Sequence, residues 1–123
     1  MLQQREIDIR VRYQETDAQS RVHHANFISY FEVGRIELFR ASGFCYKTLE
    51  ASGTMFVIAE MSCKYFLPAE YDDLLRLRTE TGRFGSASIE HTYHLYRDDE
   101  LLARGRSKIA CIDSEGGIRR LPK

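Results

Sequence analysis

A polar loop that leads directly into a helix is the part of this chain best equipped for chemistry. The stretch from Val11 to Ala18 places Asp17 in the loop, and an apolar segment of helical character follows from near His24. A helix start is electropositive because its first backbone N–H groups have no partners within the helix. A carboxylate facing such a start can attack an activated carbonyl or activate water, while the free N–H groups hold the oxyanion.

Asp17 also has a simpler interpretation. An aspartate in a loop commonly forms an Asx turn or caps a helix, and residue type alone favours that structural role. If Asp17 is catalytic, two routes are open. The carboxylate either attacks the carbonyl carbon and forms a mixed anhydride, or acts as a general base for water. The residues do not separate these routes.

Two further carboxylates are candidates for the same site. Glu15 lies two positions before Asp17, and we expect it to be solvated or paired with Arg12. Glu32 lies inside the apolar helical segment, where an unpaired charge is costly. Glu32 either faces a substrate pocket, as a binding group or a second base, or is exposed or paired with Arg35.

The histidines and cysteines predict neither a metal site nor a cysteine nucleophile. Adjacent His23 and His24 do not converge easily on one ion, and the odd spacing of His91 and His94 points them to opposite faces of a strand. The cysteines are odd in number and widely spaced, which fits neither a metal site nor a disulfide framework: Cys45, Cys63 and Cys111. We expect no cofactor and a reducing, cytoplasmic setting.

Length and charge narrow the classes of function. The chain has 123 residues, enough for a single domain that spans residues 1–123. Lys and Arg together number 18, as do Asp and Glu, so the formal net charge is zero. This balance disfavours a general nucleic-acid binder, which carries a basic excess. No apolar run is long enough for a transmembrane helix.

Hydrophobic periodicity predicts one strand, one long helix and then several strands. Ile7 to Tyr13 alternates with period two, as in a half-buried strand, and Ala25 to Ala41 has helical spacing with Gly43 as a plausible stop. A loop through Ser52-Gly53 is expected after the helix, and four more strands are predicted, at Phe56 to Leu67, Leu75 to Thr81, Ala87 to Leu95 and Ala103 to Ile112. Arg83 is expected in a turn at residues 81–85, and a turn at Gly116-Gly117 leads into a last segment, Ile118 to Pro122. Their short connections favour antiparallel pairing, which gives an α+β architecture.

The motifs around the loop and the helix resemble one enzyme family. The segments Arg12-Tyr13-Gln14-Glu15-Thr16-Asp17-Ala18 and His24-Ala25-Asn26-Phe27, followed by Tyr30-Phe31-Glu32, are similar to the start of the 4-hydroxybenzoyl-CoA thioesterase-like family. Pro68-Ala69 before Tyr71-Asp72-Asp73 matches too. The resemblance implies a hotdog fold, an antiparallel β-sheet wrapped around one long central helix, and an acyl-CoA thioesterase without a cofactor.

The resemblance also assigns roles to residues. It makes Asp17 the catalytic carboxylate and gives the backbone N–H at His24 to the thioester carbonyl. It implies a homodimer, or a tetramer built from two dimers, with the active site at the dimer interface. Expected substrate-binding residues are Tyr13, Phe27, Phe31, Glu32, Phe56, Ile58 and Arg83, the last of these for the phosphates of the ligand.

One departure from the family bears on the loop. Relatives have one or two glycines after the Asp-Ala step, whereas this chain has Gln19-Ser20-Arg21. Side chains there restrict positive φ angles and add bulk beside the site. This departure supports an alternative, a non-catalytic module that binds an acyl-CoA or an acyl-carrier thioester. A hotdog dehydratase is a weaker option, because the helix lacks a clear histidine and acid pair.

Overall fold

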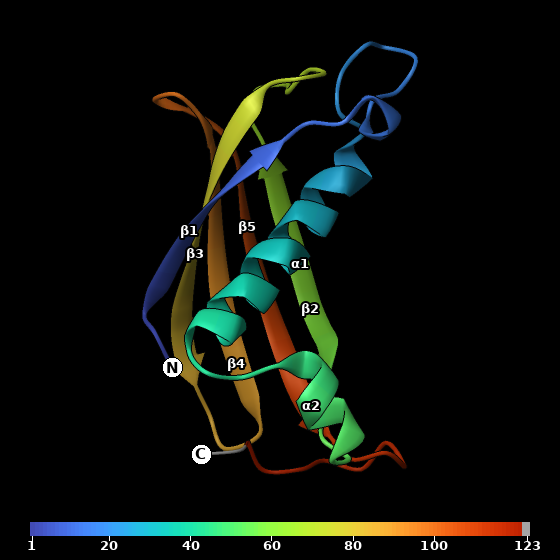
Figure 1. The fold of residues 1–123 in the computed structure, drawn as a ribbon, viewed down its shortest axis with the longest axis vertical. Coiled ribbons are helices and arrows are strands. Elements are labelled where there is room, and N and C mark those ends of the chain that lie inside the picture. Colours follow the sequence, from blue (N-terminus) through green and yellow to red (C-terminus); the bar gives the residue numbers. More distant parts are fainter. Residues whose placement is uncertain (122–123) are drawn as a thin grey trace.

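The computed structural model describes residues 1–121 and consists of one curved sheet and one long helix (Figure 1). The elements in chain order are β1 Gln4–Arg10, a 3₁₀ turn Tyr13–Glu15, α1 His24–Ala41, α2 Tyr46–Ala51, β2 Met55–Tyr65, β3 Leu74–Phe84, β4 Ser88–Arg97 and β5 Glu100–Ile112. The long helix and the four strands after it are confirmed, and α1 begins one residue earlier than expected. The first strand was predicted too far along the chain: β1 ends at Arg10, and Tyr13 belongs to the 3₁₀ turn. No helix formed by residues 1–121 is long and apolar enough to cross a membrane.

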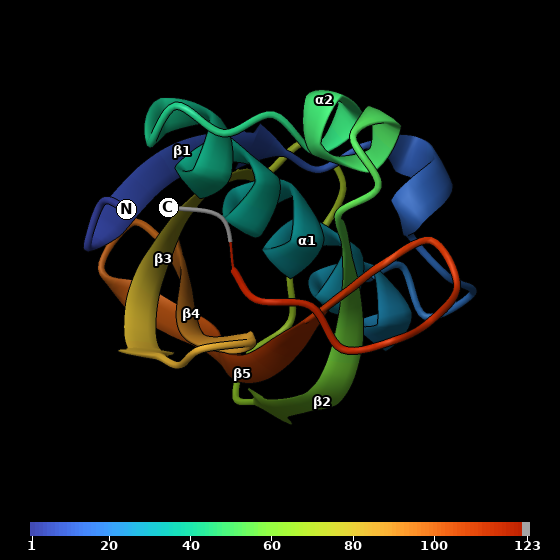
Figure 2. The same ribbon diagram turned by 90° about the horizontal axis from the view of Figure 1, so that it is seen from below.

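The five strands form one antiparallel sheet in the order β1-β3-β4-β5-β2. Viewed from below, the sheet curves around α1, so that the helix lies in its concave side (Figure 2). The strand β2 forms one edge of the sheet and has a register shift between Ile58 and Glu60. This arrangement is the α+β hotdog architecture that the resemblance implies.

The core lies between α1 and the concave face of the sheet. Strand residues that alternate toward the helix, including Leu77, Tyr93 and Leu95, have no exposed surface. From the helix, Phe31 stacks on Tyr93 with ring centroids 4.8 Å apart. Burial of these large apolar side chains contributes most of the folding free energy.

Two local features differ from the sequence-based expectations. The segment expected to be a loop before Ser52-Gly53 contains the six-residue helix α2, whose N-terminus has no side-chain cap. Arg83, expected in a turn, lies within β3, because that strand runs on to Phe84. The expected end segment from Ile118 is represented only by a bridge to Ile112, and its last residues, 122 and 123, lie outside the described residues.

The glycine of β5 that faces α1 is expected to be essential for packing. A β-carbon at Gly105 would overlap the ring of Phe31. Gly105→Ala should therefore lower the free energy of unfolding by about 1–3 kcal/mol, the usual cost of overpacking a core. Urea denaturation measures the change. Gly82→Ala is the matched control, because its β-carbon would meet only Glu90, at 3.4 Å; equal losses in both variants would contradict the prediction.

Candidate active site

The loop between β1 and α1 fixes the carboxylate of Asp17 through its own backbone. The Asp17 N–H donates to the carbonyl of Arg21 at 2.9 Å, and Ser20 donates back to the Asp17 carbonyl at 3.0 Å. One side-chain oxygen, Oδ1, accepts from the Gln19 N–H at 2.9 Å. Among residues 1–121 no donor reaches the other oxygen, Oδ2. The carboxylate is thus oriented by one oxygen and available through the other.

This loop contains a residue with a positive φ angle, a conformation that glycine usually supplies, although the loop has no glycine. Ser20 has a φ of 63°, in the left-handed region where a β-carbon is strained. The bulkier Gln19-Ser20-Arg21 sequence therefore does not prevent the tight turn that orients Asp17, although it stores strain in the loop.

Relief of this strain gives a stability prediction. Ser20→Gly should raise the free energy of unfolding by up to about 1 kcal/mol, because glycine adopts a positive φ without a steric penalty. Ser29→Gly, at an exposed position inside α1, is the control and should destabilise by about 0.5–1 kcal/mol. Thermal unfolding of both variants checks the opposite signs. A melting temperature that falls in both would show that the left-handed turn is not a source of strain.

The start of α1 leaves a backbone donor free. His23 is the N-cap: its Nδ1 accepts from the Ala25 N–H at 3.1 Å, and its own N–H donates to the carbonyl of Glu15 at 2.9 Å. The N–H of His24 donates no hydrogen bond within the described part of the chain. An unpaired N–H at a helix N-terminus is a ready donor to an oxyanion.

Glu15 connects the loop to the helix and has a structural role. Its Oε1 accepts from the Arg12 N–H and from the Tyr30 hydroxyl, both at 2.8 Å, and its Oε2 lies 3.3 Å from Arg12 Nε. Burial, followed by the hydrogen bond to Glu15, raises the pKa of the Tyr30 hydroxyl, which therefore remains a donor. The expected pairing of Glu15 with Arg12 is confirmed. The same contacts hold the loop against α1.

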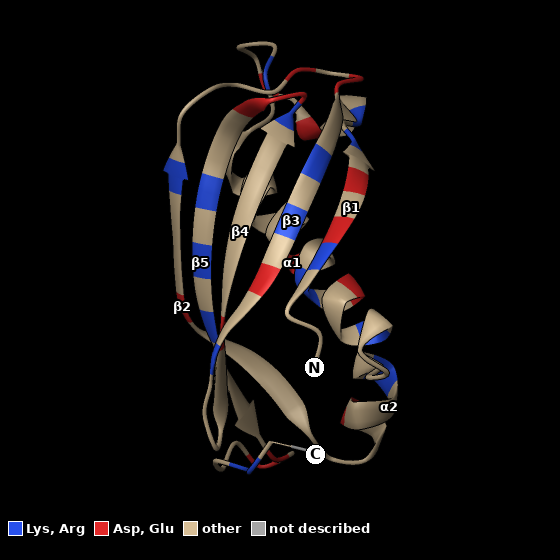
Figure 3. Cartoon of the chain, turned by 90° about the vertical axis from the view of Figure 1, so that its left-hand side faces the viewer, with Lys and Arg blue, Asp and Glu red and all other residues tan. Residues whose placement is uncertain are grey.

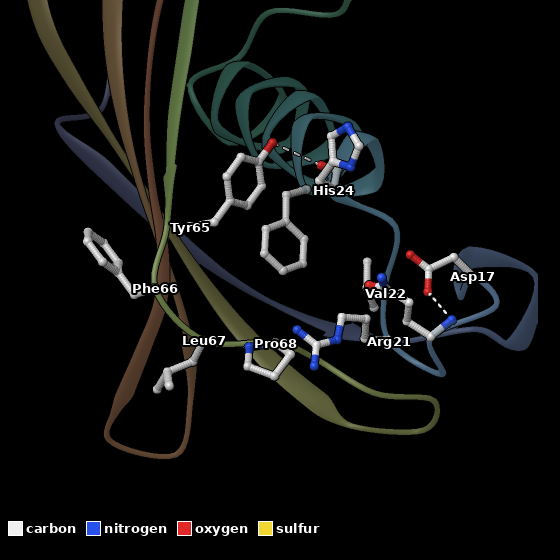
Figure 4. A pocket seen from close by; sticks show the side chains of 10 residues that line it. Asp17, Arg21, Val22, His24, Tyr65, Phe66, Leu67 and Pro68 are labelled. Carbon is white, nitrogen blue, oxygen red and sulfur yellow. Dashed lines mark hydrogen bonds between the residues drawn. The ribbon is translucent and has the colours of Figure 1, made fainter.

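Asp17 and His24 border one cavity of about 260 Å³. Figure 4 shows its lining, in which Asp17, Arg21 and Val22 come from the loop and His24 from α1. Tyr65 is the last residue of β2, and the other labelled side chains come from the segment that follows it. The full lining is Asp17, Gln19, Arg21, Val22, His24, Phe27, Tyr65, Phe66, Leu67 and Pro68. The cavity is therefore bordered by one carboxylate residue, by the first residue of α1, whose N–H is unpaired within the described residues, and by apolar side chains.

Tyr65 ties the apolar wall to the helix start. Its hydroxyl donates to the His24 carbonyl at 3.1 Å, and its ring stacks on Phe27 with centroids 5.5 Å apart. Burial raises the pKa of Tyr65 to about 12, so the hydroxyl stays protonated and continues to donate. The end of β2 is thereby held against the N-terminus of α1.

Three of the expected site residues share this cavity: Asp17, His24 and Phe27. Tyr13 is exposed and packs edge-on against Tyr71, whereas Phe31 is fully buried in the core. Neither lines the cavity. Along α1, Phe27 and Phe31 are one turn apart, and only the first lies near the end of the helix that borders the cavity.

The remaining expected residues lie elsewhere in the chain. Glu32 is exposed on α1 and forms no ion pair within residues 1–121. Phe56 packs against Phe39 at the other end of the helix, and Ile58 is exposed on the edge strand. Arg83 borders a separate hollow on the sheet.

The cavity also includes residues that the sequence did not single out. Tyr65, Phe66 and Leu67 belong to the end of the predicted strand and the turn at Pro68, about forty residues from the loop. Arg21 was noted only for its bulk. An apolar run just before a proline was the only local signal that these residues end a strand. No local pattern indicates which end of the helix they pack against.

A second group of polar residues is buried under α1, away from the cavity. Arg35 donates to the hydroxyls of Tyr93 at 3.0 Å and Tyr46 at 3.3 Å, rather than pairing with Glu32. Nearby His91 is 1% exposed, and neither of its ring nitrogens has a partner among the described residues. Burial, aided by the charge of Arg35, lowers the pKa of His91 to about 4. This histidine is a neutral core residue.

Comparison with known proteins identifies the family of the chain. The sequence profile of the Thioesterase-like superfamily matches residues 11–123. The acyl-CoA thioesterase YbgC of Haemophilus influenzae is 35% identical over 106 residues, which cover 85% of this chain and 78% of the relative. A crystal structure of a probable thioesterase from Bartonella henselae has 33% identity and a TM-score of 0.91, covering 97% of this chain and 99% of that one.

A more distant structure supports the fold alone. The DHNA-CoA thioesterase of Staphylococcus aureus superposes with a TM-score of 0.93 at 23% identity, covering 96% of this chain and 80% of that one. The predicted family, the hotdog fold and the enzyme class, thioester hydrolase, are thus confirmed. The chain belongs to the Thioesterase-like superfamily.

Proposed function

We propose that this protein hydrolyses acyl-CoA thioesters to a free acid and CoA, with Asp17 and the N-terminus of α1 acting on one carbonyl. One observation carries the proposal: Asp17, whose Oδ2 accepts from no donor, and His24, whose N–H is unpaired within the described residues, border the same cavity. The relatives named for acyl-CoA thioesterase activity supply the class of thioester.

In this mechanism the thioester carbonyl oxygen accepts from the His24 N–H. Negative charge that develops on this oxygen is stabilised there by the free donor and the helix dipole. Asp17 Oδ2 then either attacks the carbonyl carbon or takes a proton from water that attacks it. In both routes the carbon–sulfur bond breaks and CoA leaves as the thiolate, which takes up a proton. The first route needs a further step, in which water cleaves the mixed anhydride.

The apolar part of the cavity suits the part of the substrate next to the thioester. Phe27, Tyr65 and Leu67 provide apolar surface beside the two catalytic groups, and burying it against a ligand is favourable. The acyl group is either aliphatic or aromatic, since the side chains that line the cavity favour neither.

We further propose that the active protein is a homodimer joined along β2. This strand is an edge of the sheet, and it exposes Val57 and Ile58. An unpaired edge that carries apolar side chains is a template for pairing with another strand. A partner's β2 would continue the sheet and bring a second surface, including Ile58, close to the cavity of the first protomer.

Sedimentation equilibrium tests the dimer. The expected mass is twice that of the 14.3 kDa chain, or four times if two dimers associate. A protein that sediments as a single chain at micromolar concentration would contradict the proposal.

Release of free thiol from a panel of acyl-CoAs tests the function. The panel should contain short aliphatic, long aliphatic and aromatic acyl groups, with the wild-type protein at catalytic concentration. Hydrolysis of at least one member at a rate proportional to enzyme is the expected result. Tight binding of acyl-CoA without release of thiol from any member would favour a non-catalytic binding module instead.

A further inference from the structure

The convex face of the sheet carries a hollow lined by cations and hydroxyl groups. Strand register places Lys64 of β2 directly opposite Arg104 of β5, and Arg106 between Ser62 and Thr92 in the next row. These five residues border a hollow of about 500 Å³: Ser62, Lys64, Thr92, Arg104 and Arg106. We call this hollow the outer cation site.

The cations of the outer cation site have no acidic partners. Within residues 1–121, neither Lys64, Arg104 nor Arg106 lies within ion-pair distance of a carboxylate. Elsewhere on the same face the arginines are neutralised, since Arg76 lies 3.4 Å from Glu6, and Arg78 lies 2.7 Å from Glu80. Figure 3 shows the basic bands along β5 and at the end of β2, on the face turned away from α1.

This arrangement costs stability in the free protein. Like charges directly opposite each other on neighbouring strands repel, and Lys64 and Arg104 occupy such a pair. The next residue in the row, His94, separates Arg104 from Arg78, and its Nδ1 is buried without a partner. A bound anion would reduce the repulsion between Lys64 and Arg104 and would accept hydrogen bonds from both side chains.

Phosphate is the anion whose chemistry fits this lining. Guanidinium groups bind phosphate oxygens through two parallel hydrogen bonds, an ammonium group adds a point charge, and hydroxyls donate to the remaining oxygens. The adjoining hollow, which Arg83 borders, is less suitable because Glu60 and Glu90 line it as well. Their carboxylates would repel an anion. The outer cation site therefore suits phosphate better than the hollow at Arg83, where the sequence had suggested phosphate binding.

The outer cation site lies across one strand from the catalytic cavity. Lys64 and Tyr65 are consecutive at the end of β2, and successive side chains of a strand point to opposite faces. Tyr65 lines the cavity and Lys64 lines the outer cation site. The strand ends there, so a flexible ligand can pass around its end from one face to the other.

We propose that the outer cation site binds the phosphate groups at the nucleotide end of CoA while the thioester occupies the cavity. This inference rests on the proposed function and assigns Lys64, Arg104 and Arg106 to substrate binding. Arg104 and Arg106 supply the bidentate donors, and Lys64 adds charge.

Two measurements test the site, and only the second depends on hydrolysis. The first is calorimetric titration with adenosine 3′,5′-bisphosphate, which carries phosphates like those of CoA but no thioester. Arg104→Gln and Arg106→Gln should each weaken binding about tenfold or more, the usual effect of losing a hydrogen bond between charged groups. Arg76→Gln is the matched control: it removes the same charge from the same face and should leave binding unchanged.

The second measurement compares acyl-CoA with the acyl-pantetheine that lacks the nucleotide. Both variants should lower kcat/KM for acyl-CoA about tenfold and leave it unchanged for acyl-pantetheine. The free Arg104→Gln protein should melt no lower than wild type, because it loses a repulsive contact.

Other outcomes overturn the proposal. Absence of bisphosphate binding, or equal weakening by Arg76→Gln, would show that the outer cation site takes no phosphate. Binding that depends on Arg104 and Arg106, together with an unchanged preference for acyl-CoA over acyl-pantetheine, would show that its ligand is a different phosphate ester. If neither thioester is hydrolysed, the proposed function fails, and the titration alone decides whether phosphate binds.

Discussion

Replacing Asp17 by asparagine should lower kcat for acyl-CoA hydrolysis at least about a hundredfold, the scale of a lost general base or nucleophile. The amide keeps the size of the side chain, and its oxygen can still accept from the Gln19 N–H that orients Asp17. The loop should therefore keep its shape. Because the amide can neither attack the carbonyl nor take a proton from water, KM should change much less than kcat.

The control for this variant is Asp99→Asn. Asp99 is exposed in the turn between β4 and β5, so the variant makes the same chemical change away from the cavity and should retain full activity. Thiol release by both variants, with thermal unfolding to confirm folding, measures the effect. Undiminished turnover by Asp17→Asn would exclude Asp17 as base and as nucleophile.

The second large effect concerns stability in acid. His91 is neutral in the folded protein because its pKa is held at about 4, whereas an unfolded histidine has a pKa of 6.5. Between these values the unfolded chain binds more protons than the folded one, so stability falls as pH falls. The expected loss from pH 7 to pH 4 is about 3 kcal/mol for this residue, and above pH 7 it contributes no pH dependence.

Chemical denaturation across this pH range, with the variant His91→Leu alongside, isolates the contribution. Leucine does not titrate and leaves no unpartnered ring nitrogen beside Phe39. The variant should therefore become more stable relative to the wild type as pH falls from 6.5 toward 4. Parallel stability curves for the two proteins over that range would contradict the assignment.

The sequence predicted the parts of the fold that depend on local pattern. Period-two alternation placed four strands after the helix. The placement of His91 and His94 on opposite faces of β4 is confirmed, because His91 is buried under α1 while His94 lies between Arg78 and Arg104 on the convex face. Helix α2 was not predicted, because six residues without a side-chain cap carry little periodic signal. Tertiary contacts with Phe39 and Arg35 hold its Tyr46 in place.

Only one wall of the candidate site, the one formed by the loop and the start of α1, was predictable from the sequence. Asp17 and His24 are close in sequence, so a loop followed by a helix start places both. The opposite wall, formed by Tyr65, Phe66 and Leu67, comes from the end of an edge strand, and its position depends on strand order and sheet curvature. No local pattern encodes either of these properties.

Burial was equally hard to anticipate along α1. The helix spacing groups Phe27 with Phe31 and offers Glu32 as a partner for Arg35. In the fold, however, the curved sheet encloses Arg35, which donates to tyrosine hydroxyls, while Glu32 faces solvent. Which face of a buried helix meets which strand is a long-range property.

The central claim is that Asp17 and the backbone N–H of His24 act on the same carbonyl. Its most direct test is a ¹⁵N–¹H NMR titration of the Asp17→Asn protein with an acyl-CoA that the wild type hydrolyses, since the variant should hold the thioester intact. The His24 amide proton should shift downfield as it gains an acceptor, and this shift should be among the largest in the spectrum. Saturation by the ligand with the His24 amide unmoved would contradict the claim.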